Sequence, residues 1–253
     1  MESEKRVAWV TGGGTGIGQA CVEMLAARGW SVAVTSRRAE NVDAAIASAV
    51  AKGGDPVRLL ALPLDVSDAA AVAAAAERIV AAFGRIDLLV NSAGINVRAR
   101  NWPHVTTEGW DQVVDINLNG VMYCMQAVLP VMRAQKLGTI VNVASWAGKF
   151  VSPLTGPAYS ASKHAVVALT HSFNMENCGD NLRACCICPG EVATPILKSR
   201  PVVPTAEEQA RMLQAEDVAS AIVYVAEAPQ RVCLNEIVIS PTWNRSFLTS
   251  GGP

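Results

Sequence analysis

The chain has 253 residues, of which 51% are hydrophobic and 17% are charged, a composition typical of a globular protein rather than a disordered one. Its formal net charge of −1 gives no electrostatic basis for binding nucleic acid. The first residues lack the apolar core of a signal peptide, and no window holds the ~18 apolar residues of a spanning helix. We therefore expect a cytoplasmic protein with no nucleic-acid or membrane partner.

Apolar runs and helical patterns alternate from one end of the chain to the other. Strands are predicted at residues 6–11, 31–35, 57–65, 86–91, 138–145, 182–188 and 234–240. Helices are predicted at residues 16–28, in an alanine-rich stretch ending near 53, and at 68–83, 106–133, 157–177 and 217–227.

The predicted strands are continuous apolar runs, as expected when helices cover both faces of a parallel sheet. A repeat of this kind predicts a Rossmann-like, doubly wound α/β fold with three layers. No linker divides the chain, so we expect a single domain over residues 1–253, with a substrate loop at about 191–212.

The chain contains seven cysteines, an odd number that does not suggest a disulfide framework. Cys185, Cys186 and Cys188 cluster in a short apolar run, which favours a buried strand over a metal site. No Cys-x2-Cys pair or nearby histidine accompanies them, and we predict no metal.

A glycine-rich turn joins the first predicted strand to the first helix. Gly12, Gly16 and Gly18 let the backbone turn tightly and approach a pyrophosphate, which the free N–H groups of the helix would bind. The alternative is an ordinary glycine-rich turn, but its place between strand and helix favours cofactor binding.

Tyr159 and Lys163 lie four residues apart on a predicted helix, so the phenol and the ammonium share one face. A nearby cation favours the phenolate and lowers the tyrosine pKa, which makes the tyrosine a usable acid and base. The alternative is a surface tyrosine beside a solvated lysine. Ser145, at the end of a predicted strand, favours the first interpretation.

Polar and glycine residues stand at the carboxyl ends of the predicted strands. In an open parallel sheet these ends meet at the edge where ligands bind. The residues are Thr11, Gly12, Ser36, Arg37, Asp65, Asn91, Ser145, Pro189 and Gly190.

The end of the second strand indicates the nucleotide. An NAD-preferring site places a carboxylate there, whereas this chain has Ser36, Arg37 and Arg38, and no acid before Glu40. A hydroxyl and guanidinium groups suit a 2′-phosphate, so we predict NADP(H) over NAD(H). The alternative is that the arginines are surface charges of the next helix, and we expect only one of them to contact phosphate.

With these motifs the chain resembles the short-chain dehydrogenase/reductase family along its whole length. The resemblance rests on Thr11-Gly-x3-Gly-x-Gly18, Asn91-Ser-Ala-Gly94, Asn117, Ser145, Tyr159-x3-Lys163 and Pro189-Gly190. It implies a sheet of order 3-2-1-4-5-6-7 and a catalytic tetrad of Asn117, Ser145, Tyr159 and Lys163. In that tetrad Lys163 also holds ribose hydroxyls, and Asn117 anchors a water that relays protons.

The resemblance also implies a cofactor cleft. It places Asp65 and Val66 at the adenine, and Val192 and Thr194 at the nicotinamide carboxamide; Asp65 is alternatively a simple helix cap. The full predicted set is Gly12, Gly14, Thr15, Gly16, Ile17, Gly18, Ser36, Arg37, Arg38, Asp65, Val66, Asn91, Ala93, Gly94, Tyr159, Lys163, Pro189, Gly190, Val192 and Thr194.

The predicted substrate residues are Asn96, Ser145, Trp146 and Tyr159. One alternative is that Arg98 or Arg100 pairs with a substrate acid, but we expect both to be exposed surface cations.

Together these features predict an NADP(H)-dependent oxidoreductase that interconverts a carbonyl and a secondary alcohol on a small to medium substrate. The alternatives are a 3-oxoacyl-thioester reductase, which the ending at 235–245 disfavours, and a non-catalytic NADP(H)-sensing protein. Relatives commonly pair their long helices, so we expect a homotetramer or homodimer.

Overall fold

The computed structural model describes residues 6–245, so residues 1–5 and 246–253 of the predicted domain lie outside the described residues. Seven parallel strands form one sheet in the order β3-β2-β1-β4-β5-β6-β7, which confirms the predicted topology. The strands are β1 (Val7–Thr11), β2 (Ser31–Thr35), β3 (Leu59–Ala61), β4 (Leu88–Asn91), β5 (Gly138–Val143), β6 (Leu182–Pro189) and β7 (Glu236–Ile239).

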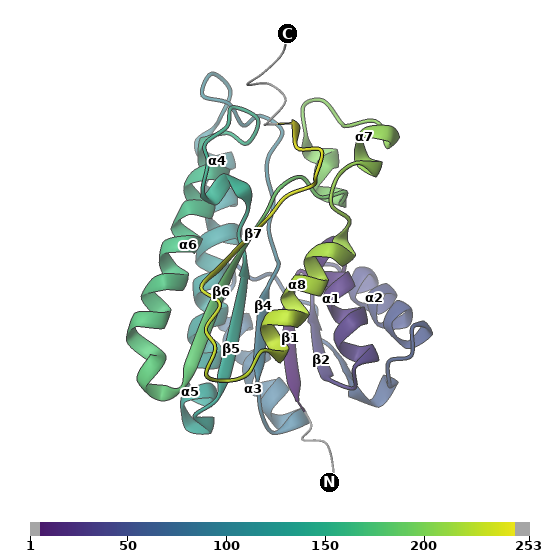
Figure 1. Ribbon diagram of the computed structural model, residues 1–253, viewed down its shortest axis with the longest axis vertical. Helices are drawn as coiled ribbons and strands as arrows, with labels where there is room; N and C mark the ends of the chain where they lie inside the picture. The colour runs from purple at the N-terminus through teal and green to yellow at the C-terminus, as the bar shows by residue number, and fades with distance from the viewer. Residues whose placement is uncertain (1–5, 246–253) are drawn as a thin grey trace.

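Helices cover both faces of the sheet (Figure 1). One face carries α3 (Ala69–Phe83), α5 (Gly120–Gln135) and α6 (Pro157–Asn177), and the other carries α1 (Gly16–Ala27), α2 (Ala39–Ala51) and α8 (Ala215–Glu227). Successive strand residues alternate between the two cores: Trp9 belongs to the first and Val10 to the second. Both faces are therefore apolar, as the continuous strand patterns predicted.

The register of the sheet brings the strand ends to one edge. Thr11 lies opposite Thr35 on β2 and opposite Asn91 on β4, and Asn91 in turn lies opposite Asn142 on β5. The chain leaves β1 on one side and β4 on the other, so a crevice opens between them at this edge.

The third strand is shorter than the predicted 57–65. Pro56–Arg58 form a 3-10 turn (η1) that Asp55 caps, and the strand covers only Leu59–Ala61. Pro63 has no N–H to donate, although Leu64 still donates to the Ser36 carbonyl at 3.1 Å. Leu62 likewise donates to the Val34 carbonyl at 2.9 Å, so the chain stays beside β2 beyond the end of the strand itself.

The predicted helix at 106–133 is three consecutive helical segments. α4 (Thr107–Val114) passes into a π-helical turn, η2 (Asp115–Asn119), and then into α5. π-turns of this kind recur at functional sites, and this one contains Asn117.

The segment after β6 holds two short helices, η5 (Pro195–Ser199) and α7 (Ala206–Ala210), besides α8. Its ends are tied together, since Leu213 donates to Glu191 O at 3.0 Å and Ala193 donates to Leu213 O at 2.8 Å. Residues 191–213 thus form a closed loop over the crevice edge, close to the predicted 191–212.

Cys185, Cys186 and Cys188 are buried in β6, as the apolar run predicted. Over the stretch from residue 6 to residue 245, no helix has the length and apolarity that crossing a membrane requires.

Candidate active site

A cavity of about 1470 Å³ lies at the carboxyl edge of the sheet. It extends from the glycine turn and the end of β2, past Tyr159, to the loop after β6. Residues far apart in the chain therefore share one space.

The turn between β1 and α1 is compact because glycine stands at crowded positions. A Cβ on Gly12 would lie 2.7 Å from the Ala93 nitrogen, and one on Gly18 would overlap the Gly12 carbonyl. Gly12 and Gly16 also have φ values of 64° and 55°. The Thr15 side chain makes no capping bond at the start of α1, so the first N–H groups of the helix stay available to an anion.

Two arginines follow β2, and they differ in their contacts. Arg38 lies 4.0 Å from Glu40, and its guanidinium donates to the Asn41 amide oxygen. Arg37 is exposed, lines the cavity, and makes no hydrogen bond or ion pair within residues 6–245. Arg37 is thus the guanidinium free to meet an anion here.

The remaining predicted cofactor residues form the cavity wall. Asp65 accepts from the Ser67 N–H and hydroxyl, while Asp68 caps α3, so Asp65 is not the helix cap. The other wall residues of this set are Thr15, Ile17, Ser36, Val66, Ala93, Gly94, Pro189, Gly190, Val192 and Thr194.

Asn117 is fully buried and holds the loop after β4. Its Oδ1 accepts from Ile95 N at 2.8 Å, and its Nδ2 donates to Ile95 O at 2.9 Å. A buried amide left unpaired would cost stability, and here both its ends are paired.

Ser145, Tyr159 and Lys163 come together at the middle of the cavity. Ser145 follows β5, accepts from Ala147 N at 3.1 Å, and acts on the Tyr159 phenol in the direction that lowers its pKa. The Lys163 ammonium lies 5.7 Å from the Tyr159 ring centroid, as expected for residues one helical turn apart, and donates to Val143 O at 2.9 Å. The predicted pair therefore faces one site.

Burial decides the pKa values of both groups. It lowers the pKa of Lys163, which is 3% exposed, to about 8. It raises the pKa of Tyr159, against the lowering effects of the Ser145 hydrogen bond and of the Arg200 and Arg100 charges. The expected lowering of the tyrosine pKa by Lys163 is therefore not found in this structure, since burial dominates and the cations that act on the phenol are arginines.

Four predicted site residues do not line the cavity. Gly14 packs against Ser36 and Asn41, Gly18 packs against the Gly12 carbonyl, and Asn117 lies behind the wall. Asn91 is buried and donates to Asn142 Oδ1 at 2.9 Å, which joins β4 to β5. These residues shape the site without facing it.

The expectation of an exposed Arg100 is wrong. Arg98 is exposed, but Arg100 is 6% exposed and lines the cavity. Its guanidinium donates to Val97 O at 2.7 Å and Ser199 O at 2.5 Å. The loop after β4 folds inward against Gly156, whose φ of 73° and missing Cβ make room for the Arg100 backbone.

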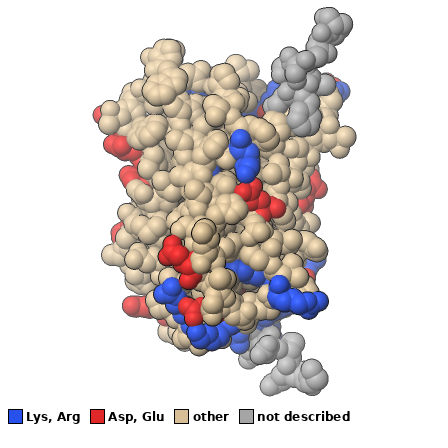
Figure 2. All heavy atoms as spheres, turned by 60° about the vertical axis from the view of Figure 1, so that its left-hand side comes forward, with Lys and Arg blue, Asp and Glu red and all other residues tan. Residues whose placement is uncertain are grey.

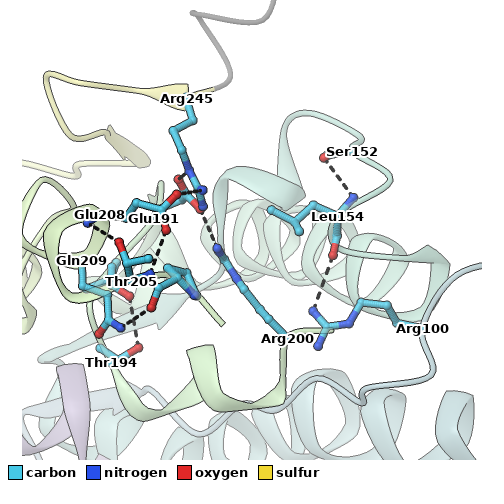
Figure 3. A network of polar contacts seen from close by, with 12 residues as sticks. Arg100, Ser152, Leu154, Glu191, Thr194, Arg200, Thr205, Glu208, Gln209 and Arg245 are labelled. Carbon is cyan, nitrogen blue, oxygen red and sulfur yellow. Dashed lines mark hydrogen bonds and ion pairs between the residues drawn. The ribbon is translucent and has the colours of Figure 1, made fainter. Parts of the chain in front are cut away.

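The cavity also contains a charged network that the sequence did not reveal. Glu191 accepts from Arg200 at 2.7 Å and, through both carboxylate oxygens, from Arg245 at 2.6 and 2.8 Å (Figure 3). Arg245 also donates to Glu208 at 3.0 Å. The only local signal was Glu191 directly after Pro189-Gly190, because the loop 191–213 must close to bring Arg200 to it, and Arg245 comes from beyond β7.

Asn96 and Trp146, two of the predicted substrate residues, line the same end of the cavity. Asn96 donates to Thr155 O at 2.9 Å, and the Trp146 ring lies 4.5 Å from that of Phe150. Trp146 gives this end an aromatic wall beside Ser145.

Comparison with known proteins shows what this arrangement resembles. The family model for short chain dehydrogenases matches residues 6–202. A 2-dehydro-3-deoxy-L-rhamnonate dehydrogenase (NAD(+)) of Sphingomonas sp. (strain SKA58) is 36% identical over 98% of this chain and 94% of its own length. A 3-oxoacyl acyl-carrier-protein reductase of Thermotoga maritima is 32% identical over 94% of this chain and 97% of its own.

Among solved structures, an alcohol dehydrogenase of the archaeon Thermococcus sibiricus complexed with 5-hydroxy-NADP superimposes with a TM-score of 0.84. It is 25% identical, and the match covers 96% of this chain and 99% of that one.

Proposed function

The chain belongs to the short-chain dehydrogenase family and is an oxidoreductase, and from that premise we propose that it interconverts a carbonyl and a secondary alcohol with NADP(H). The observation that carries this proposal is the common cavity. It joins the glycine turn at Gly12 to the Ser145, Tyr159 and Lys163 cluster.

Tyr159 acts as the general acid and base in this proposal. In reduction its phenol gives a proton to the forming alkoxide, and in oxidation it takes the proton from the alcohol. Ser145, which acts on the phenol and lines the same cavity, donates to the substrate oxygen as charge develops there. Lys163 places a cation beside the ring, 5.7 Å from its centroid, and Asn117 keeps the neighbouring loop in place.

The nucleotide fits the residues present, and it supplies or accepts the hydride when bound. Two features suit a pyrophosphate. The turn at Gly12 is too close-packed for a side chain, and the first N–H groups of α1 have no side-chain cap. We assign Lys163 to the ribose hydroxyls and Val192 and Thr194 to the nicotinamide carboxamide; all three residues line the cavity, which supports this assignment.

A preference for NADP(H) over NAD(H) is supported by the end of β2. Arg37 is a cavity guanidinium with no partner within residues 6–245, and Ser36 adds a hydroxyl. The similar proteins include an enzyme named for NAD(+) and a structure containing an NADP derivative, so the preference needs its own measurement.

The substrate end suits a small to medium molecule. Trp146 and Phe150 form an aromatic wall, and the loop 191–213 is tied at both ends over the cavity. The reductase of 3-oxoacyl thioesters among the similar proteins makes that activity the second candidate.

We also propose that the protein works in the cytoplasm as a homotetramer or homodimer. Figure 2 shows the side of the molecule that carries α6, with uncharged atoms over most of it. Met122 on α5 and Met175 on α6 are exposed apolar side chains that pairing with a second copy would cover.

The test is a panel of ketones, aldehydes and secondary alcohols, assayed by the absorbance of the reduced nucleotide at neutral and alkaline pH. We expect turnover, with a higher kcat/KM for NADPH than for NADH. Binding of NADPH with no turnover across the panel would favour the sensing alternative instead.

A further inference from the structure

Arg100 is a buried cation without an anion. No carboxylate within residues 6–245 lies within ion-pair distance of it, and its acceptors are the Val97, Leu154 and Ser199 carbonyls and the Ser199 hydroxyl. Side chains of this type are rarely buried to 6% exposure unless they are paired with a charge. The fold therefore keeps a guanidinium in the cavity wall with only neutral partners.

The neighbouring charges do not neutralise Arg100. Glu191 is occupied by Arg200 and Arg245, and Glu208 by Arg245. Arg100, Arg200 and Arg245 carry three positive charges. Glu191 and Glu208 carry two negative charges, so one positive charge is left over. Figure 3 shows Arg200 reaching from beside Arg100 to the Glu191–Arg245 pair, so the excess charge lies on the Arg100 side.

The guanidinium keeps capacity for one more acceptor. It carries five N–H bonds, and the bond from Nη1 to Leu154 O is 3.5 Å long, at the limit of a hydrogen bond. The Nη1 group is thus the part of Arg100 that a better acceptor can engage.

Arg100 is also near the reacting group. Its backbone packs against Gly156, at the start of the helix that carries Tyr159. The charges of Arg200 and Arg100 act on the phenol and oppose the rise of its pKa, whose main cause is burial.

We propose that the substrate carries a carboxylate close to its carbonyl or alcohol carbon, and that Arg100 binds this carboxylate. The substrate class is therefore short oxo acids and hydroxy acids. The planar guanidinium matches a carboxylate, whose charge would complete the balance of the cavity. This inference rests on the proposed function and names the substrate class for the same site.

The test uses matched pairs of neutral and charged probes, all of them secondary alcohols: 2-hydroxybutyrate, 3-hydroxybutyrate and 4-hydroxypentanoate and their methyl esters, with 2-butanol as the uncharged reference. The expected result is a kcat/KM for the best acid about tenfold to a hundredfold above that of its ester, the ratio for a charge-assisted hydrogen bond. The position of the hydroxyl in the best acid then reports the spacing between the carboxylate and the reacting carbon.

Two variants distinguish recognition from structural support. Arg100→Lys keeps the charge but loses the planar fork, and we expect it to lower kcat/KM for the acid about tenfold while the ester and 2-butanol change little. Arg98→Met is the matched control, since Arg98 is exposed and does not line the cavity. If Arg100→Lys lowers kcat/KM equally for the acid and for its ester, Arg100 only supports the fold and the inference is overturned.

A binding measurement makes the inference independent of turnover. With nucleotide present, the best acid is expected to raise the midpoint of thermal unfolding in the wild type but not in Arg100→Lys. If the esters and 2-butanol are turned over with the same kcat/KM as the acids, the inference is overturned and the proposed function stands.

If no probe is turned over, but an acid raises the unfolding midpoint of the wild type and not of Arg100→Lys, the proposed function is overturned instead. If none of the acids raises the unfolding midpoint of the wild type, the inference is overturned.

Discussion

At the end of the cavity near β1 and β2 the wall contains the glycine turn, whereas at the end near β6 it contains a network of charged side chains. The first, the glycine end, comprises residues 12–18 and 36–38. The second, the arginine end, comprises Arg100, Glu191, Arg200 and Arg245. The glycine end comes from two short stretches that follow neighbouring strands, β1 and β2, and the arginine end from three segments far apart in the chain.

The difference explains what each end recognises. A backbone turn and the N–H groups of a helix bind any pyrophosphate, so the glycine end suits a nucleotide shared by many enzymes. Fixed guanidinium groups can select the charge and shape of one substrate class, so the arginine end is where we expect the substrate to be selected. Tyr159 lies between the two ends of the cavity, so its substitution is expected to have the largest effect.

The largest effect is expected for Tyr159→Phe. Loss of the phenol removes the proton donor and acceptor, so kcat should fall about 10²- to 10⁴-fold. The nucleotide-binding turn is untouched, so NADPH affinity, measured by fluorescence titration, should stay the same. Tyr224→Phe, an exposed tyrosine on α8, is the control. Undiminished turnover in Tyr159→Phe would remove the phenol from the chemistry.

Lys163→Met should change the pH dependence of stability. Burial lowers the pKa of Lys163 from 10.5 to about 8, so between these values the unfolded chain binds more protons than the folded protein. The wild type should therefore gain about 3 kcal/mol of unfolding free energy relative to Lys163→Met as pH rises through this window. Urea unfolding at pH 7.5 to 10.5, roughly the interval between the two pKa values, measures the slope.

The exposed Lys198 supplies the control for this measurement, as Lys198→Met. If the unfolding free energy has the same dependence on pH in the wild type and in Lys163→Met, burial does not lower the pKa of Lys163.

Gly18→Ala tests whether the glycine end depends on close backbone contact. Its Cβ would overlap the Gly12 carbonyl, so the turn must shift, at a cost of about 1–3 kcal/mol of unfolding free energy and with weaker NADPH binding. Gly179→Ala is the matched control, because a Cβ there meets nothing within 4 Å. Equal stability and affinity in both variants would show that the turn tolerates a side chain.

The smallest effect is expected for Arg37→Ala. The variant lacks the exposed guanidinium that we assign to the 2′-phosphate of NADPH. The ratio of kcat/KM for NADPH to kcat/KM for NADH should therefore fall about tenfold. Arg38→Ala should change the ratio less, because Arg38 is engaged by Asn41 and Glu40. A higher kcat/KM for NADH in the wild type, or an unchanged ratio in Arg37→Ala, would contradict the assignment.

Much of the fold could be predicted because its signals are local. Continuous apolar runs such as Val7–Thr11 indicated buried parallel strands, and alternation with helices indicated the doubly wound sheet. β3 was predicted too long because Pro56–Arg58 form a 3-10 turn, and beyond Ala61 only single N–H groups, those of Leu62 and Leu64, still donate to β2 and the residue after it. The helix at 106–133 was predicted continuous because a π-turn leaves no pattern in the sequence.

The candidate site divides in the same way. The turn at Gly12 and the spacing of Tyr159 and Lys163 follow from backbone geometry, so the sequence by itself determined them. The burial of Arg100 and the pairing of Glu191 with Arg200 and Arg245 were decided only by the tertiary structure. Burial and charge pairing depend on which distant segments meet, and that also sets the pKa values of Tyr159 and Lys163.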